Sequence, residues 1–146
     1  MAKFIYKYES VKKVKESLEK KAQKEVASID LKIEKVKNEI LEVDEKRKQI
    51  SLSGEENDIV KASELHSKIY YAKYLEEHKK SLLEKLGKLE LEKKTLLDEL
   101  VKKSKEHKIF KTLEEKHLQN FITEENKNDQ IRMDDISVQK FVRKMK

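Results

Sequence analysis

Residues 26–50, VASIDLKIEKVKNEILEVDEKRKQI, decide the fold of this chain. Apolar residues recur in this stretch at alternating gaps of three and four, with one full heptad at the end: Val26, Ile29, Ile33, Val36, Ile40, Val43 and Ile50. This spacing is typical of coiled-coil helices, which bury one narrow apolar seam. No proline interrupts the chain. The sequence therefore predicts long helices that pack against one another.

The composition agrees with this prediction. Charged residues make up 44% of the chain and hydrophobic residues 36%, which is too polar for a globular core but suits a thin seam. Disorder is the competing class, yet disordered chains lack periodic branched aliphatic residues and are rich in proline and glycine. This chain has two glycines and no proline, so we expect ordered helices.

The chain is predicted to be a single all-α domain of residues 1–146, folded as an antiparallel coiled-coil hairpin. Helix one is expected over about 4–50, the hairpin turn over about 51–58, and a longer helix two over about 59–142. Within SLSGEEND, Gly54 permits the left-handed backbone that ends a helix, and Asn57 or Asp58 can cap the next helix.

Each predicted helix has its own seam. Before Val26 the seam of helix one is expected to continue through Tyr8, Val11, Val14, Leu18 and Ala22. Helix two carries a seam of Leu65, Ile69, Ala72, Leu75, Leu82, Leu86, Leu89, Leu96 and Leu100, with Lys79 and Lys93 also at seam positions. Gly87 lies within this register and indicates a local bend, a close helix approach or a tolerated weakness.

Folding about residue 54 would bring Val26 near Leu82 and Val11 near Leu97. Residues beyond about Lys105 then have no partner in helix one and would project by roughly 50 to 60 Å as a helix. The projection keeps an apolar stripe at helical spacing, formed by Phe110, Leu113, His117, Phe121, Val138, Val142 and Met145. This stripe predicts docking of a partner, with dimerisation as the alternative.

The segment from Asp129 to Ile136, followed by Phe141, combines a polar cluster with spaced apolar residues near the end of the chain. Here the chain resembles the FliJ family of the flagellar type III export apparatus. Family members carry an EQK-x-LDE-type motif shortly before an aromatic or apolar position, and the matching residues here are Gln130, Met133, Asp134, Asp135 and Phe141. Asp129 and Arg132 depart from the motif. The aromatic-rich opening and the following E-x-x-A-Q-x-E-[LV]-A run are matched by Phe4, Tyr6, Val11, Glu19, Ala22, Gln23, Glu25, Val26 and Ala27.

The resemblance implies a non-enzymatic stalk, similar in shape to the shaft of a rotary ATP synthase. Such a stalk would sit in the central hole of a hexameric flagellar export ATPase, promote assembly of its ring and link it to a membrane-embedded export gate. Export chaperones are further implied partners, and the implied location is cytoplasmic, peripheral to the inner face of the cell membrane. The residues implied to contact the ATPase ring are Phe4, Tyr6, Gln130, Arg132, Met133, Asp134, Asp135 and Phe141.

A second contact is predicted near the hairpin turn. Tyr70, Tyr71 and Tyr74 cluster beside Leu75, and a coiled-coil seam can hide at most two of the three rings. Because exposed tyrosines contribute strongly to interfaces, we expect this cluster to contact the export gate or another partner. The alternative is that the rings lie flat on neighbouring lysine stems.

The net charge of +6 and a pI near 9.2 raise the possibility of nucleic acid or an anionic membrane as partner. The basic excess lies at the two ends, where Lys3, Lys7, Arg143 and Lys144 would suit an acidic ATPase pore. Elsewhere lysine alternates with glutamate, so no specific nucleic-acid binding is predicted. No apolar run reaches the roughly 20 residues that membrane insertion requires.

Catalytic, metal and cofactor sites are not predicted. His66, His78, His107 and His117 never occur at the i, i+4 spacing that places two ligands on one helix face. The chain has no cysteine and no glycine-rich phosphate loop. An enzyme is therefore not expected, and the alternative function is a generic coiled-coil scaffold or a prefoldin-like holdase chaperone.

Overall fold

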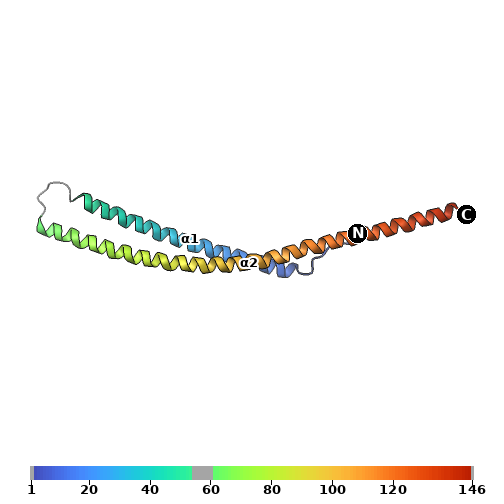
Figure 1. Ribbon diagram of the computed structural model, residues 1–146, viewed down its shortest axis with the longest axis horizontal. Coiled ribbons are helices and arrows are strands. Elements are labelled where there is room, and N and C mark those ends of the chain that lie inside the picture. The colour runs from blue at the N-terminus through green and yellow to red at the C-terminus, as the bar shows by residue number, and fades with distance from the viewer. Residues whose placement is uncertain (1, 54–60, 146) are drawn as a thin grey trace. The chain divides into compact units, whose positions relative to one another are not determined.

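The computed structural model describes residues 2–53 and 61–145. These ranges contain two helices, α1 over Glu9–Leu52 with 44 residues and α2 over Ala62–Lys144 with 83 residues (Figure 1). The helices pack against each other in antiparallel directions, and the described residues contain no strand. The predicted all-α antiparallel hairpin with a longer second helix is therefore confirmed.

By their contacts the residues form two units, each containing a part of α1 and a part of α2. Unit one comprises Met1–Lys20 and Lys102–Lys146, and unit two comprises Lys21–Val101. The prediction of a single helical-hairpin domain over residues 1–146 stays a prediction.

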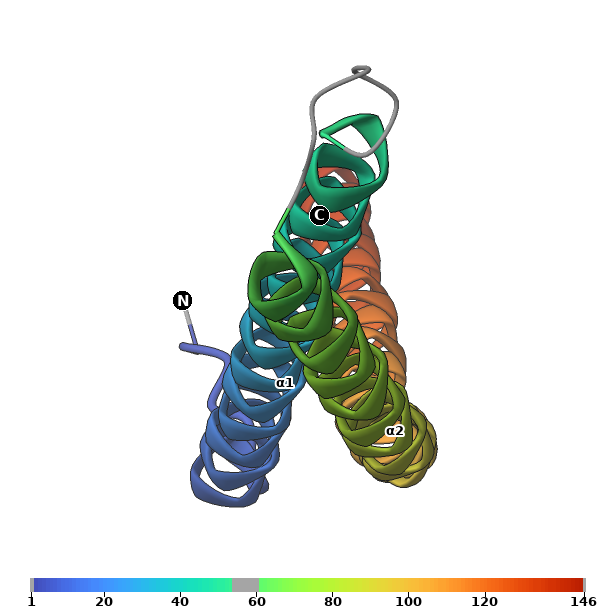
Figure 2. The ribbon, with the colours of Figure 1, turned by 90° about the vertical axis from the view of Figure 1, so that its left-hand side faces the viewer.

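Unit two contains the apolar core. Val36 and Val43 of α1 are buried in one cluster with Leu75 and Leu82 of α2. Ile40, Ile50, Leu86 and Leu89 are partly buried against this cluster. Figure 2 shows the end of α1 beside the first part of α2. Since burying one such side chain contributes about 1.5–3 kcal/mol, this seam is the main source of stability in unit two.

The register of the two helices differs from the prediction. Leu82 packs in the cluster of Val43, whereas folding about residue 54 placed it near Val26. The prediction assumed two arms of equal length on either side of a tight turn. In the actual register the branched residues of α1 pack against the leucines of α2, so that each α1 residue faces a residue of α2 nearer the C-terminus than predicted.

Two ion pairs join the helices at the edges of this seam. The Lys79 ammonium donates to Asp44 Oδ1 at 2.7 Å. Lys93 Nζ lies 2.6 Å from Asp30 Oδ1. Both lysines occupy seam positions, as the sequence predicted, and each reaches a carboxylate on the other helix. The two pairs specify the same antiparallel register as the apolar cluster.

The first part of α2 extends past the described end of α1. Ile50 packs on the cluster of Leu75, and α1 ends at Leu52. Leu65 and Ile69 are consequently 54% and 50% exposed, so their assignment to the seam was wrong. The predicted turn lies partly outside the described residues, which exclude Gly54, Asn57 and Asp58. Of its other residues, Ser51 and Leu52 form the end of α1.

Gly87 lies in the middle of α2 without a conformational or packing requirement. An added Cβ would have no atom within 4 Å, so the helices do not approach closely at this position. Glycine in a helix interior costs about 1 kcal/mol relative to alanine because it loses more backbone freedom on folding. The interpretation as a close helix approach was therefore wrong, and Gly87 as a tolerated weakness of the helix stays a prediction.

We therefore expect Gly87→Ala to stabilise the protein by about 1 kcal/mol. Thermal unfolding followed by far-ultraviolet circular dichroism should give the variant a higher midpoint temperature than that of the wild type. An unchanged or lower midpoint would contradict this interpretation of Gly87.

Candidate partner-binding surfaces

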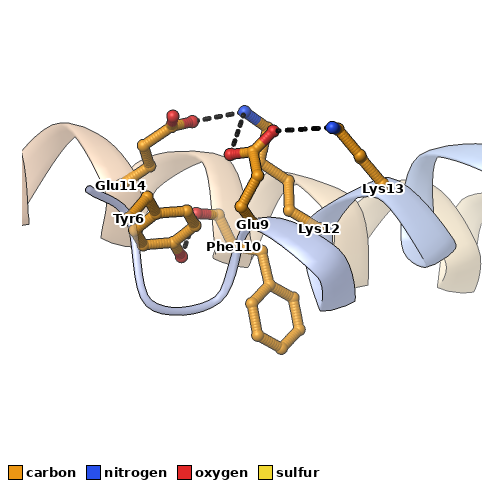
Figure 3. A network of polar contacts seen from close by, with 6 residues as sticks. All are labelled: Tyr6, Glu9, Lys12, Lys13, Phe110 and Glu114. Carbon is orange, nitrogen blue, oxygen red and sulfur yellow. Dashed lines mark hydrogen bonds and ion pairs between the residues drawn. The ribbon is translucent and has the colours of Figure 1, made fainter.

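The open end of unit one is held together by aromatic side chains. Tyr6 is buried, and its hydroxyl donates a hydrogen bond of 2.9 Å to the Phe110 carbonyl of α2 (Figure 3). Its ring meets the His117 ring edge-on with centroids 5.8 Å apart. Phe4 packs against Phe121 with centroids 5.6 Å apart. Burial raises the pKa of the Tyr6 phenol, which therefore stays protonated as a donor.

This arrangement depends on a backbone that is not helical before α1. The sequence predicted a helix from about Phe4, but α1 begins at Glu9. Aromatic residues occupy alternate positions at Phe4, Tyr6 and Tyr8, a period that matches extended chain rather than helix. All three rings pack against aromatic rings of α2. Tertiary contacts with α2 therefore replace the first helical turn.

The seam of unit one is charged. Lys12 donates to Glu114, as Figure 3 shows, and Lys15 donates to Glu106 Oε2 at 2.8 Å. His107 Nδ1 lies 2.6 Å from Glu19 Oε2. These α1 residues continue the heptad gaps of the apolar seam toward the N-terminus. The helices are thus paired here by complementary charge.

The ion pairs shift the titration of their members. The hydrogen bond from Lys15 lowers the pKa of Glu106 below its ordinary value of 4.5. Because the carboxyl pKa is lower in the folded chain than in the unfolded chain, this pair stabilises the fold at pH values above the unfolded-state pKa. Its contribution is lost as the pH falls through the folded-state pKa. The hydrogen bond to Glu114 raises the pKa of Lys12, whose contribution is lost only as the pH rises through that raised value.

The charged seam corrects two predictions. Val11, Val14 and Leu18 were expected in the seam but are 38%, 57% and 37% exposed. The unpaired projection was expected to begin near Lys105, yet pairing continues as far as Phe121. The first error arose because the prediction required an apolar seam, whereas oppositely charged residues occupy these positions. The second followed from the register that folding about residue 54 assumed. The part of α2 beyond Phe121 spans roughly 35 Å, less than expected.

The C-terminal segment, defined as residues 126–145, presents every side chain to solvent. It contains the predicted contact residues Gln130, Arg132, Met133, Asp134, Asp135 and Phe141. Met133 is 66% and Phe141 65% exposed. Five more large apolar side chains are exposed in this segment: Ile131, Ile136, Val138, Val142 and Met145. Such a surface on one helix can contact a partner without rearrangement of the hairpin.

The remaining two predicted ring-contact residues have a different environment. Tyr6 is buried and Phe4 is half-buried in the aromatic packing of unit one. Their structural effect is to close the open end of the hairpin. Arg132 Nη1 lies 3.8 Å from Asp129 Oδ1, one turn away.

The predicted tyrosine surface is present near the start of α2. Tyr70, Tyr71 and Tyr74 are 72%, 44% and 58% exposed, whereas Leu75 is buried in the core of unit two. The Tyr74 ring stacks between two neighbours, with centroids 6.3 Å from Tyr71 and 6.1 Å from His78. Tyr71 and Tyr74 thus stack in one row with His78, and Tyr70 lies against His66 with centroids 6.3 Å apart. We call the exposed Tyr70, Tyr71 and Tyr74 the aromatic patch.

The described residues contain no group of three or more potential ligands that could hold a metal ion. Across residues 2–53 and 61–145, no helix has the length and apolar character needed to cross a membrane. What these residues present instead are extended helical surfaces, suited to contacts with other proteins.

Comparison with known proteins decides the family. The family described as "Flagellar FliJ protein" matches residues 4–146, which is nearly the whole chain. The chain belongs to the FliJ family. None of the curated proteins and none of the solved structures compared with it matches significantly. FliJ membership confirms the resemblance of the two ends and makes this chain a coiled-coil component of flagellar protein export.

Membership in the FliJ family also agrees with a role in flagellum biogenesis and with the helical hairpin observed here. The family is a structural export component rather than a known enzyme, and its partners belong to the flagellar export apparatus. The sequence reasoning missed the charged seam of this FliJ protein. Its signal was the continuation of the heptad gaps through Lys12, Lys15 and Glu19, opposite the basic and acidic residues of α2.

The charged seam can be tested by exchange of one ion pair. We expect Lys15→Glu to lower the midpoint of thermal unfolding, because two carboxylates then face each other. Adding Glu106→Lys to this variant should restore most of the lost stability. Circular dichroism measures both. Lys13→Glu, whose side chain is 71% exposed, is the matched control for net charge.

Rescue of Lys15→Glu but not of Lys13→Glu by Glu106→Lys is the expected result. Equal rescue of both would show that net charge, and not the pair, determines stability. In the wild type, the contribution of the pair should disappear as the pH falls below the lowered pKa of Glu106.

Proposed function

We propose that this FliJ-family chain acts as the central stalk of the flagellar type III export apparatus. In this role it inserts its C-terminal segment into the hexameric export ATPase, promotes assembly of the ring and links it to the membrane-embedded export gate and to export chaperones. The stalk has no catalytic function of its own and is held at the cytoplasmic face of the cell membrane by these partners. The observation that carries the proposal is the fully exposed C-terminal segment.

The exposure of that segment supports a partner contact energetically. A helix without tertiary packing is marginal in water, so the segment gains stability when its apolar residues are covered. Met133 and Phe141 present large side chains, which are the types that dominate binding energy at interfaces. Asp134 and Asp135 lie beside Met133 and can pair with basic groups of the ring.

Charge at the end of α2 supports an orientation for this contact. Arg143 and Lys144 occupy its last turn, where cations interact favourably with the negative end of the helix dipole. Both remain exposed and available to acidic groups on a partner. Complementary charge accelerates encounter and fixes orientation more than it tightens a complex. We therefore assign binding energy to the apolar residues and orientation to the basic ones.

The aromatic patch of Tyr70, Tyr71 and Tyr74 supports a second contact, which we assign to the export gate. It lies in unit two, whereas the C-terminal segment belongs to unit one. The two surfaces share no residue. A stalk that links two partners requires such separate surfaces, since one surface cannot be occupied by both.

We expect replacement of Met133 and Phe141 by glutamate to abolish most stimulation of the export ATPase. Purified ATPase is titrated with the chain, and hydrolysis is measured. Loss of two interface anchors should raise the half-maximal concentration roughly tenfold or more. Leu91→Glu is the matched control, because Leu91 is 68% exposed in unit two. Truncation after Glu125 should leave the hairpin folded and remove stimulation.

Unchanged stimulation by the Met133 and Phe141 double variant, with a folded hairpin, would contradict the stalk assignment. A generic holdase predicts another pattern: no activation of the ATPase, but suppressed aggregation of unrelated unfolded proteins. The truncated chain would then suppress aggregation as well as the full chain does.

The second contact is tested with Tyr70→Ser combined with Tyr74→Ser. We expect binding to the purified cytoplasmic part of the export gate to weaken by roughly tenfold or more, since exposed tyrosines contribute strongly to interfaces. Biolayer interferometry measures the affinity, and Leu41→Ser, at a position 60% exposed, is the control. Undiminished gate binding by the double variant would remove the tyrosines from the proposal, and ATPase stimulation should stay at the wild-type level.

A further inference from the structure

One flank of unit one carries apolar residues that the hairpin does not use. Val11, Val14 and Leu18 follow one another on α1 at gaps of three and four, which places them along one side of the helix. Their exposures are 38%, 57% and 37%. The adjoining seam positions are Lys12, Lys15 and Glu19, so these apolar residues lie beside the seam and not in it.

Residues of α2 extend this flank. Lys12 of α1 pairs with Glu114 of α2. Val11 directly precedes Lys12 in the sequence, and Leu113 directly precedes Glu114. In two antiparallel helices, positions directly preceding a paired seam residue lie on the same side of the pair, so Leu113 adjoins Val11. Ile109 is one turn from Leu113 and 64% exposed. We name this surface the basic flank. It comprises Val11, Val14, Leu18, Ile109 and Leu113, together with Lys105, Lys108 and Lys116.

The lysines are concentrated on the α2 side. A shallow groove around Ile109 and Leu113 is lined by Lys105, Lys108, Thr112 and Lys116, without a carboxylate among its residues. Glu106 and Glu114, which adjoin lining residues in the sequence, are already paired with Lys15 and Lys12. An apolar stripe bordered by lysines in this groove suits an occupant that supplies both apolar and negative side chains.

The spacing of the stripe indicates the form of that occupant. Apolar residues at gaps of three and four offer a row of knobs to another helix laid alongside, as in helix-in-groove recognition. A second copy of this chain is a poor occupant, because the same flank is basic in each copy and like charges facing each other are unfavourable. The C-terminal segment of a second copy has five basic residues against three acidic ones, so it too carries a net positive charge.

We propose that the basic flank is a docking site for an amphipathic helix of a partner protein, with one apolar stripe bordered by Asp or Glu. The helix packs on α1 and α2 of unit one as a third strand of the coiled coil. Its apolar residues cover Val14 and Ile109, and its carboxylates pair with Lys105, Lys108 and Lys116. This site shares no residue with the C-terminal segment or the aromatic patch, and it does not depend on the stalk function.

The test uses the full chain and a defined probe. The probe is a fluorescein-labelled three-heptad helical peptide with leucine at its a and d positions and glutamate at its e and g positions. A second peptide carries lysine at e and g. We expect the acidic peptide to bind roughly tenfold or more tightly than the basic one in fluorescence anisotropy, because only its charges complement the flank.

Variants locate the binding site. Val14→Glu and Ile109→Glu should each weaken binding of the acidic peptide by roughly fivefold or more, since both remove apolar contact and add like charge. Leu41→Glu and Leu91→Glu are matched controls at positions 60% and 68% exposed in unit two, and they should bind as the wild type does. Circular dichroism verifies that each variant folds.

Three results would overturn the proposal. Equal binding of the acidic and basic peptides would show that charge complementarity does not determine which peptide binds. Undiminished binding by both flank variants would show that the peptide binds at another surface. A dimer in sedimentation equilibrium that Val14→Glu and Ile109→Glu both dissociate would make a second copy the occupant. ATPase stimulation provides the separate readout: if it fails while peptide binding follows the flank variants, the docking site stands and the stalk function does not.

Discussion

The structure depends on one apolar seam between two antiparallel helices in unit two. Val36 and Val43 of α1 are buried in one cluster with Leu75 and Leu82 of α2. A slip by one heptad would keep the apolar pattern but would separate Lys79 from Asp44 and Lys93 from Asp30. Burial therefore supplies the stability and the edge ion pairs select the register, as charged and polar positions do in coiled coils.

Unit one is paired by a different kind of interaction. Its seam contains Lys12, Lys15 and Glu19, and ion pairs with half-exposed partners contribute much less than a buried leucine. The aromatic contacts of Phe4 and Tyr6 with α2 compensate in part. This division leaves the apolar residues of unit one free for other proteins. Stability resides in unit two, and unit one carries two of the three surfaces that we assign to partners.

Much of the fold was predictable from the sequence because it is repetitive. The heptad gaps from Val26 to Ile50 predicted a seam that is present, and the leucines from Leu75 to Leu100 predicted its partner. The register was not predictable, since equal seams can be paired in several ways and the choice depends on packing and on ion pairs between distant residues. The aromatic residues before Glu9 were assigned to a helix, because only contact with α2 makes the extended backbone favourable.

The candidate surfaces were predictable in part. Exposure of Met133 and Phe141 followed from their position near the end of a longer helix, and the tyrosines were too many for one seam. The exposure of Val11, Val14 and Leu18 was not foreseen, because apolar residues at helical spacing were taken as seam and charged residues as surface. In unit one both assignments are reversed: Lys12, Lys15 and Glu19 have partners across the seam, and Val11, Val14 and Leu18 face solvent.

The C-terminal segment of α2 has no packing against α1 in the isolated chain, since all its described residues are exposed. Hydrogen exchange monitored by mass spectrometry, on a sample that sedimentation shows to be monomeric, tests this most directly. We expect slow exchange around Val36 and Leu82 and fast exchange throughout residues 126–144, where an unpacked helix opens readily. Slow exchange of residues 126–144, comparable to that around Leu82, would contradict it.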